Sequence, residues 1–256
     1  HYRDRRQRQM CIRDSTNSGK LSSEKTIIIS DTKIKSIENG YKEASDDDIK
    51  IYDLKSKVVL PGLIDFHVHM ESQSGGQDRY VRRFQDNKAD IAFRSSVIAK
   101  KTLMSGFTTV RDVGGSGVNI SLRNAINNGV IPGPRIFTSG KTIATTGGHG
   151  DRTNGFRDDL VDDPGPEQGV VNSIADARKA VRYRYKNGAD LIKITATGGV
   201  MSLAKNGQNP QFTEEVIREI VKTADDYGMH VAAHAHGDEG MFRAVNAGVT
   251  LSLIHI

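Results

Sequence analysis

The chain of 256 residues has one cysteine, Cys11, and no tryptophan, and aromatic residues make up only 6% of it. A single cysteine excludes a disulfide framework, although it does not fix the cellular compartment. No apolar run approaches the roughly 18 residues of a membrane-spanning helix, so we expect neither an integral membrane protein nor a membrane partner. The hydrophobic content of 36% is still sufficient for a core, and no low-complexity tract indicates disorder.

Basic residues outnumber acidic ones, but the excess is concentrated at the N-terminus. The chain has 36 Lys and Arg residues against 31 Asp and Glu, and residues 1–14 alone contribute +3 to the net charge of +5. The remaining charge forms no basic stripe interleaved with aromatic side chains, which is the pattern typical of a nucleic-acid-binding surface. We therefore expect no nucleic-acid partner.

The two ends of the chain resemble laboratory DNA more than natural protein. Residues 10–15 (MCIRDS) are one reading frame of the transposon end used in sequencing-library preparation, and residues 5–9 (RRQRQ) match the adjoining primer site. Residues 251–256 (LSLIHI) are the reverse complement of the same transposon end. A natural basic arm and a natural apolar terminus are the alternative. We predict that residues 1–15 and 251–256 are adapter-derived and that the natural protein is longer in both directions.

Between these ends the pattern of the sequence changes near Pro61. Residues 16–60 contain three strand-like runs (26–29, 34–37 and 49–54) separated by polar turns, which predicts a small β-domain. Residues 61–250 alternate strand and helix signals, which predicts α/β architecture with a parallel sheet, either doubly wound or a (β/α)8 barrel. The expected strands are 63–67, 107–111, 135–139, 191–195 and 230–233, and the expected helices are 90–105, 172–187 and 214–227, each followed by a glycine suited to a C-cap.

Histidines follow two of these strands in the same arrangement. Asp65, His67 and His69 alternate along the first strand and therefore point to one side of it. Two imidazoles so spaced can bind one metal ion, and the carboxylate can orient them from behind. Ordinary strand-end histidines are the alternative. The fifth strand repeats the pattern with His234 and His236, and this recurrence at an equivalent position favours a metal site.

Lys193 lies within an otherwise apolar strand, LIKIT. A buried lysine is costly unless it is paired or discharged. Its ammonium form has no lone pair and cannot bind a metal ion, whereas the neutral amine can react with carbon dioxide to give a carbamate with two anionic oxygens. A structural lysine paired with a carboxylate is the alternative, and spacing alone does not decide between the two.

Two glycine-rich segments, 146–150 (TGGHG) and 197–201 (TGGVM), fall on loops that follow strands. Glycines let backbone amides approach a ligand such as phosphate, although simple turns explain the same pattern. Within these loops we single out His149 as a substrate contact. We expect Arg111 and Asp112, at the end of the second strand, to form a structural ion pair.

These motifs together resemble those of the amidohydrolase superfamily, in particular the branch with metal-dependent Xaa-Pro and Xaa-Arg dipeptidases and imidazolonepropionase-like proteins. The match covers nearly all of residues 26–250, and the motifs occur in the family's order. The motifs are VLPGLIDFHVH (59–69), GFTTVRD (106–112), IKI (192–194) and AHAHG (233–237), and TGGHG (146–150) is similar to the dipeptidase side.

The resemblance implies a (β/α)8 TIM barrel, of which this chain holds about five of the eight strands, with a β-sandwich built from both chain ends. It also implies a divalent metal site, most simply with two zinc ions. His67 and His69 then bind one metal ion, the carboxylated Lys193 bridges both, and His234 binds the second.

We further assign substrate binding to His149 and His236, and we expect Asp65 to support the metal ligands from behind. The family pattern continues with a histidine after strand six and a general-base aspartate after strand eight, both of which we expect beyond residue 250. His255 falls near the first of these positions, but it belongs to the predicted adapter sequence. We therefore expect the chain by itself to have little activity and to be insoluble or dynamic.

The implied reaction is hydrolysis of C–N bonds in small substrates, dipeptides above all, by a metal-activated water. An imidazolonepropionase-like enzyme that opens a cyclic amide is one alternative, but Lys193 argues against it because a one-metal site has less need of a bridging carbamate. A non-catalytic barrel that binds a metal or an anionic ligand is another. The substrate side chain, the native metal, the compartment and any homo-oligomer of the full-length protein remain open.

Overall fold

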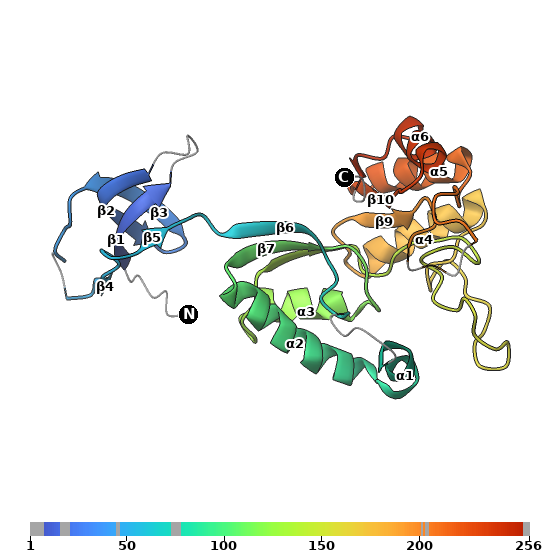
Figure 1. Ribbon diagram of the computed structural model, residues 1–256, viewed down its shortest axis with the longest axis horizontal. Helices are drawn as coiled ribbons and strands as arrows, with labels where there is room; N and C mark the ends of the chain where they lie inside the picture. Colours follow the sequence, from blue (N-terminus) through green and yellow to red (C-terminus); the bar gives the residue numbers. More distant parts are fainter. Residues whose placement is uncertain are drawn as a thin grey trace. The chain divides into compact units, whose positions relative to one another are not determined.

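The computed structural model of the chain describes residues 8–15, 21–44, 47–72, 78–200, 202 and 205–252. The chain divides into two compact units, His1–Gly62 and Leu63–Ile256 (Figure 1). Among the residues described, no helix has the length and apolar character needed to cross a bilayer.

The first unit is a five-stranded sheet. Its strands run in the order β3-β2-β1-β4, and β5 also pairs with β1. The strand β1 therefore lies in the interior of the sheet, antiparallel to β2 and parallel to β4 and β5. It is formed by residues predicted to be adapter-derived, and their origin stays a prediction. The strands are β1 (Arg8–Ser15), β2 (Leu21–Ser30), β3 (Lys33–Asn39), β4 (Lys50–Tyr52) and β5 (Val58–Val59).

The β2–β3 hairpin shows why this unit has only a small core. A turn at Asp31, whose φ of +55° is left-handed, joins the two strands. Ile27 is buried on β2, whereas Ile34 and Ile37 on β3 are 61% and 48% exposed. The described residues of this unit form one sheet and contain no second, facing sheet, so the predicted sandwich is not seen in them. The strand β3 also runs through Asn39, where a turn was predicted.

The second unit contains two three-stranded parallel sheets, β6-β7-β8 and β9-β10-β11. The first five strands correspond to the five that the sequence predicts, and the short sixth strand adds residues at the predicted adapter end. Their bounds are β6 (Leu63–Val68), β7 (Phe107–Asp112), β8 (Arg135–Thr138), β9 (Ile192–Thr195), β10 (Val231–His234) and β11 (Leu251–Ser252).

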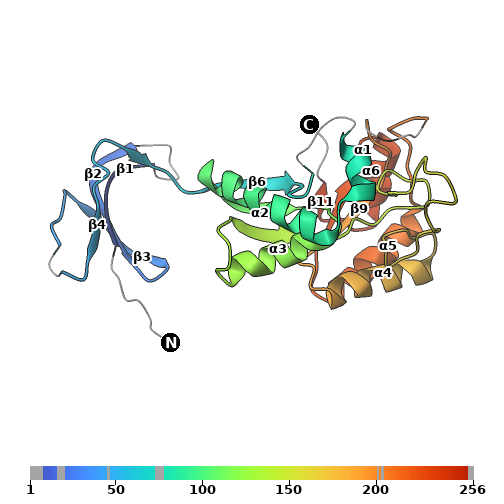
Figure 2. The same ribbon diagram turned by 90° about the horizontal axis from the view of Figure 1, so that it is seen from below.

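Helices alternate with these strands, as a parallel sheet requires. In both views α2 lies beside α3, and α4 lies beside α5 (Figures 1 and 2). The glycines after α2, α4 and α5 are left-handed, as predicted, with φ of +94° at Gly106, +83° at Gly188 and +66° at Gly228. The helices are α1 (Asp78–Gln85), α2 (Lys88–Met104), α3 (Val118–Asn127), α4 (Ile174–Lys186), α5 (Glu214–Asp225) and α6 (Asp238–Asn246).

The largest core lies between β9, β10, α4 and α5. Ile192 and Ile194 on β9 are fully buried together with Ile217 and Ile220 on α5. Burying such a side chain stabilises the fold by about 1.5–3 kcal/mol. All four residues of β9 are buried, so both faces of this strand are covered and Lys193 lies on the face opposite the two isoleucines.

The strand β6 has the opposite character, because it is the edge of its sheet. Leu63, Ile64 and Phe66 on this strand are each about half exposed or more. Exposed apolar side chains on both faces of an edge strand favour association with other chains.

Candidate metal and substrate site

The site begins with two side chains on one face of neighbouring strands. In the parallel pairing of β9 and β10, Lys193 lies opposite Ala232 and Thr195 lies opposite His234. Residues two apart on a strand share a face, so Lys193 and His234 face the same side, with His234 one step nearer the carboxyl ends. They are only 3% and 8% exposed.

Lys193 has no carboxylate within ion-pair distance among the residues described. Burial, and to a lesser extent the positive charge of Arg111, lower the pKa of its amine to about 7. Such an amine is readily discharged near neutral pH. The alternative of a lysine held by a carboxylate partner is therefore not supported in this part of the chain.

His234 is fixed by a hydrogen bond at one ring nitrogen. Its Nε2 lies 2.8 Å from the carbonyl oxygen of Gly198, and because a carbonyl only accepts, Nε2 carries the proton. This leaves Nδ1 as the nitrogen with a lone pair. Burial lowers the pKa of His234 to about 4, and the neighbouring His149 contributes to the shift. The imidazole is therefore neutral at physiological pH, as a metal ligand must be.

His149 lies against His234, with ring centroids 4.4 Å apart and an interplanar angle of 32°. Gly199 makes this approach feasible. A Cβ atom at position 199 would lie 2.7 Å from Cε1 of His149 and 3.0 Å from Nε2 of His234. The second glycine-rich loop thus serves close packing of two imidazoles.

Hydrogen bonds between neighbouring side chains and backbone groups hold the first glycine-rich loop in place. The backbone N–H of His149 donates to Oε1 of Gln211 at 2.8 Å, and that of Gly147 donates to Oδ2 of Asp151 at 2.9 Å. Asn154 donates to the carbonyl of Gly148 at 2.7 Å. Amides already bonded to protein groups are not available to an anion, so the phosphate cradle considered from the sequence is not supported at this loop.

The other imidazole pair lies at the end of β6. The rings of His67 and His69 have centroids 5.3 Å apart at an interplanar angle of 73°. Nδ1 of His69 donates to the carbonyl of Gly114 at 2.8 Å, which orients the ring. Oδ1 of Asp65 accepts from the backbone N–H of His67 at 2.9 Å. Asp65 therefore supports the pair through the backbone of His67, whereas the sequence suggested a carboxylate that orients the imidazoles themselves.

His236, the second histidine of the fifth strand's pair, is exposed. Its backbone N–H donates to Oγ1 of Thr197 at 2.9 Å. Its charge contributes to the lowered pKa of His234, which places the two side chains in the same neighbourhood.

The predicted ion pair between Arg111 and Asp112 is wrong. Adjacent residues of a strand point to opposite faces, and the two side chains have different partners. Arg111 donates from Nε to the carbonyl of Phe66 at 2.8 Å, and its guanidinium lies 5.2 Å from the centre of the Phe66 ring. Asp112 is fully buried and accepts from the amides of Met70 and Gly114 at 3.2 and 3.3 Å. Burial raises its pKa to about 7.

A supporting network around the β6 pair was missed at the sequence level. The carboxylate of Glu71 accepts from the backbone N–H groups of Ser116 at 2.6 Å and Asn119 at 2.9 Å, at the start of α3. Asn119 also donates from its side chain to Asp112 at 3.3 Å. In the sequence, the single signal that could have indicated this network was an acidic residue, Glu71, two positions after His69.

No group of three or more His, Cys, Asp or Glu side chains is arranged to hold a metal ion among the described residues. The predicted ligands lie instead as the His67–His69 pair, as His234, whose ring contacts the predicted substrate residue His149, and as Lys193. Their chemistry nevertheless fits a metal. His234 is neutral, Lys193 is easily discharged, and Gly199 presents no side chain to the two imidazoles beside it.

The protein is of the α/β class, and its parallel strands carry imidazoles and a buried lysine near their ends. Comparison with known proteins identifies its family. Residues 58–254 match the amidohydrolase family, and the chain belongs to that family. The resemblance seen in the motifs is thereby confirmed.

The proteins to which this chain is similar include an ochratoxinase, a Xaa-Pro dipeptidase and a prolidase. Ochratoxinase from Aspergillus niger is 32% identical over 210 residues, which is 78% of this chain and 43% of that protein. A solved Xaa-Pro dipeptidase with bound methionine in its active site is 48% identical, with a TM-score of 0.89 over 95% of this chain and 60% of that chain. A prolidase complexed with N-methylphosphonate-L-proline is 32% identical, with a TM-score of 0.83 over 96% and 60%. The chain thus spans less than half of the curated relatives it matches.

Proposed function

We propose that this chain forms the greater part of the metal site of an amidohydrolase that cleaves amide bonds of small substrates, dipeptides first among them. The observation that carries the proposal is the placement of Lys193 and His234 on one face of β9 and β10, both buried and both with a lowered pKa. Buried groups with strongly shifted pKa values are typical of functional sites. The similarity to a Xaa-Pro dipeptidase and a prolidase supports linear dipeptides over a cyclic amide.

In this proposal two divalent ions, most simply zinc, are held by His67, His69, His234 and a carbamate of Lys193. The neutral amine of Lys193 attacks the carbon of carbon dioxide, so a nitrogen–carbon bond forms while one carbon–oxygen π bond opens onto oxygen, and one amine proton leaves to water. The carbamate carries one negative charge shared by two oxygens, where the amine carried none. A divalent metal held by these residues would supply Lewis-acid activation of water and polarisation of the amide carbonyl.

The remaining residues of the site orient the metal-binding imidazoles or bind the substrate. The Gly198 carbonyl fixes the tautomer of His234, and the Gly114 carbonyl orients the ring of His69. Hydrogen bonds of this kind hold a metal-binding imidazole in place and raise its basicity. His149 lies against His234, and His236 lies in its neighbourhood. We assign substrate binding to these two histidines.

Metal binding by the chain tests the proposal more directly than turnover does, because none of the residues discussed is assigned as the general base. Metal content is measured by elemental mass spectrometry after equilibration with zinc and bicarbonate. His234→Asn should weaken zinc binding by about tenfold or more, since even the loss of a residue that supports a ligand costs that much. His230→Asn is the matched control, because His230 is exposed and precedes β10.

A panel of Xaa-Pro and other dipeptides, followed by mass spectrometry of the products, then tests the reaction. Equal zinc binding by wild type and His234→Asn would contradict the proposed site. Zinc binding without any dipeptide cleavage, in a longer protein that contains this chain, would retain the metal site and reject the proposed substrate class.

A further inference from the structure

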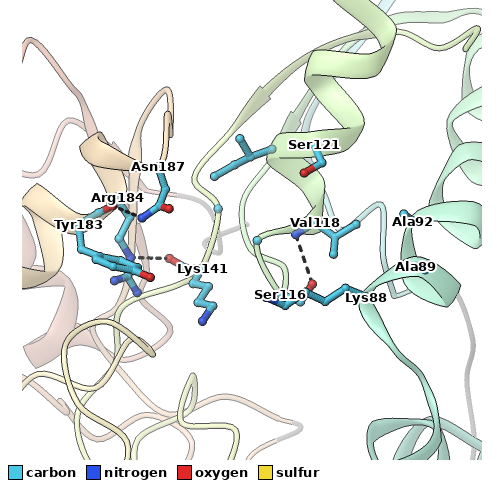
Figure 3. Close-up of a pocket in the computed structure, with 13 residues that line it drawn as sticks. Lys88, Ala89, Ala92, Ser116, Val118, Ser121, Lys141, Tyr183, Arg184 and Asn187 are labelled. Carbon is cyan, nitrogen blue, oxygen red and sulfur yellow. Dashed lines mark hydrogen bonds between the residues drawn. The ribbon is translucent and has the colours of Figure 1, made fainter. Parts of the chain in front are cut away.

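A cluster of charged side chains that has no role in the proposed reaction lines a cavity of the protein. A cavity of about 440 Å³ lies within the second unit, between the starts of α2 and α3 and the C-terminal part of α4 (Figure 3). Its polar lining includes Lys88, Ser116, Lys141, Tyr183 and Arg184. The residues assigned to the metal and substrate site do not line it.

Arg184 is a buried cation whose hydrogen bonds go to neutral groups. The side chain is 3% exposed. It donates to the carbonyls of Lys141 at 3.2 Å, Pro166 at 2.7 Å and Thr142 at 3.3 Å. Carbonyls satisfy the donors of a guanidinium, but they do not neutralise its charge. Burial accordingly lowers the pKa of Arg184 to about 10. A buried charge without a counter-ion is costly, so an anion nearby would be stabilising.

Lys141 adds a second positive charge at the same place. Its side chain extends into the open space between the α4 residues and the start of α3 (Figure 3). Burial lowers the pKa of Lys141, and the positive charges of Arg184, Arg152 and Lys88 lower it further. Several cations therefore lie close enough to one another to interact.

The acidic groups near this cluster already have partners. Glu167, whose charge favours protonated Lys141, is in an ion pair with Lys179 at 3.2 Å. Within the described part of the chain, Lys88, Lys141 and Arg184 take part in no ion pair. The cluster thus has an excess of positive charge beside an open volume.

The start of α3 does not supply the binding groups here. The backbone amides of Ser116 and Asn119 already donate to the carboxylate of Glu71. We therefore assign recognition of a ligand in this cavity to side chains, namely the ammonium groups of Lys88 and Lys141 and the hydroxyl of Tyr183.

We propose that this cavity is a binding site for a small oxyanion with two negative charges, of the phosphate or phosphate-monoester class. Lys141 and Lys88 contact the oxyanion, and the charge of Arg184 stabilises it from the wall of the cavity. Two or more negative charges match the several cations of the cluster better than a monovalent anion does. The volume also leaves room for an organic group attached to the phosphate.

Calorimetric titration of a longer protein that contains this chain tests the proposal with two probes, inorganic phosphate and glycerol 3-phosphate. Chelated, metal-free protein is used so that neither probe can bind at a metal, and sodium chloride keeps the ionic strength constant. Lys141→Met retains the aliphatic stem and removes the charge, and it should weaken binding about tenfold or more. Lys100→Met is the matched control, because Lys100 is exposed on α2 and its loss changes the net charge equally.

Tighter binding of glycerol 3-phosphate identifies a phosphate monoester as the ligand, and equal affinities identify the free oxyanion. Equal weakening by Lys141→Met and Lys100→Met, or no binding by the wild type, overturns the proposal. Circular-dichroism melting checks that each variant folds, and Lys88→Met replaces Lys141→Met if the latter does not. His234→Asn should leave phosphate binding unchanged, which separates this site from the proposed metal site.

Discussion

The ring of His149 lies 4.4 Å from the ring of His234, although the two residues are 85 positions apart in the chain. His234 ends the buried strand β10, and His149 belongs to a loop held by Gln211 and Asp151. The contact therefore joins a rigid strand to a separately supported loop. It also puts a predicted substrate residue directly beside a predicted metal ligand.

Gly199→Ala should disturb this contact. The added Cβ would lie within 3.0 Å of both imidazoles, and overpacking of this kind typically costs about 1–3 kcal/mol. We expect a lower melting temperature and weaker zinc binding, measured by competition with a chromogenic chelator. Gly165→Ala is the control, since a Cβ there meets only the Gln168 side chain at 3.9 Å. Equal behaviour of the two variants would show that Gly199 is not needed for packing.

Lys193→Met should stabilise the metal-free fold, most strongly at neutral and lower pH. The pKa of Lys193 falls from 10.5 in the unfolded chain to about 7 in the folded one, so the unfolded state binds more protons between these values. Wild-type stability should therefore rise with pH across this window. The advantage of the variant, at most about 5 kcal/mol near pH 7, should shrink towards pH 10.

Urea unfolding at pH 6, 8 and 10, with chelator and without carbon dioxide, measures this difference. Lys186→Met is the control, because Lys186 is exposed near the end of α4. Addition of zinc and bicarbonate should then stabilise the wild type more than Lys193→Met, which keeps the histidines but has no amine to form a carbamate. A constant difference between wild type and Lys193→Met at all three pH values would contradict the lowered pKa.

The strands and glycine-capped helices could be predicted because their signals are local. Gly106, Gly188 and Gly228 each adopt the left-handed conformation that ends a helix, and the apolar runs after them set the strand positions. The helices α3 and α6 were missed because each follows a glycine, Gly117 or Gly237, in place of a side chain that caps the N-terminus.

Only the features of the site that follow from strand periodicity could be predicted from the sequence. Together with the strand register, the alternation rule explains why Lys193 and His234 share a face. The same rule, had it been applied to Arg111 and Asp112, would have excluded an ion pair between adjacent residues. The stacking on His149 depends instead on the paths of two loops. No local pattern in the sequence encodes those paths.

Asp112→Asn should remove a pH dependence of stability. Burial raises the pKa of Asp112 from 3.8 to about 7, so the folded state binds more protons than the unfolded state between these values. This contribution to stability is complete below pH 3.8 and is lost as the pH rises to about 7, by at most about 4 kcal/mol. The free energy of unfolding of wild type minus that of Asp112→Asn should fall between pH 4 and 7. A difference that does not change with pH in chemical unfolding would refute the raised pKa.

Glu71→Gln should destabilise α3 by about 1 kcal/mol, the usual cost of losing a charged N-terminal cap. The carboxylate of Glu71 accepts from two amides at the start of α3, and an amide side chain has one acceptor oxygen to offer them. Unfolding followed by circular dichroism measures the loss. Glu215→Gln is the control, because Glu215 lies in the first turn of α5, where Thr213 supplies the cap, so this variant loses a helix-end charge without losing the cap. An equal loss in both variants would mean that the helix dipole accounts for the whole effect. A larger loss in Glu71→Gln, accompanied by weaker zinc binding, would show that this cap also positions the Gly114 carbonyl that orients His69.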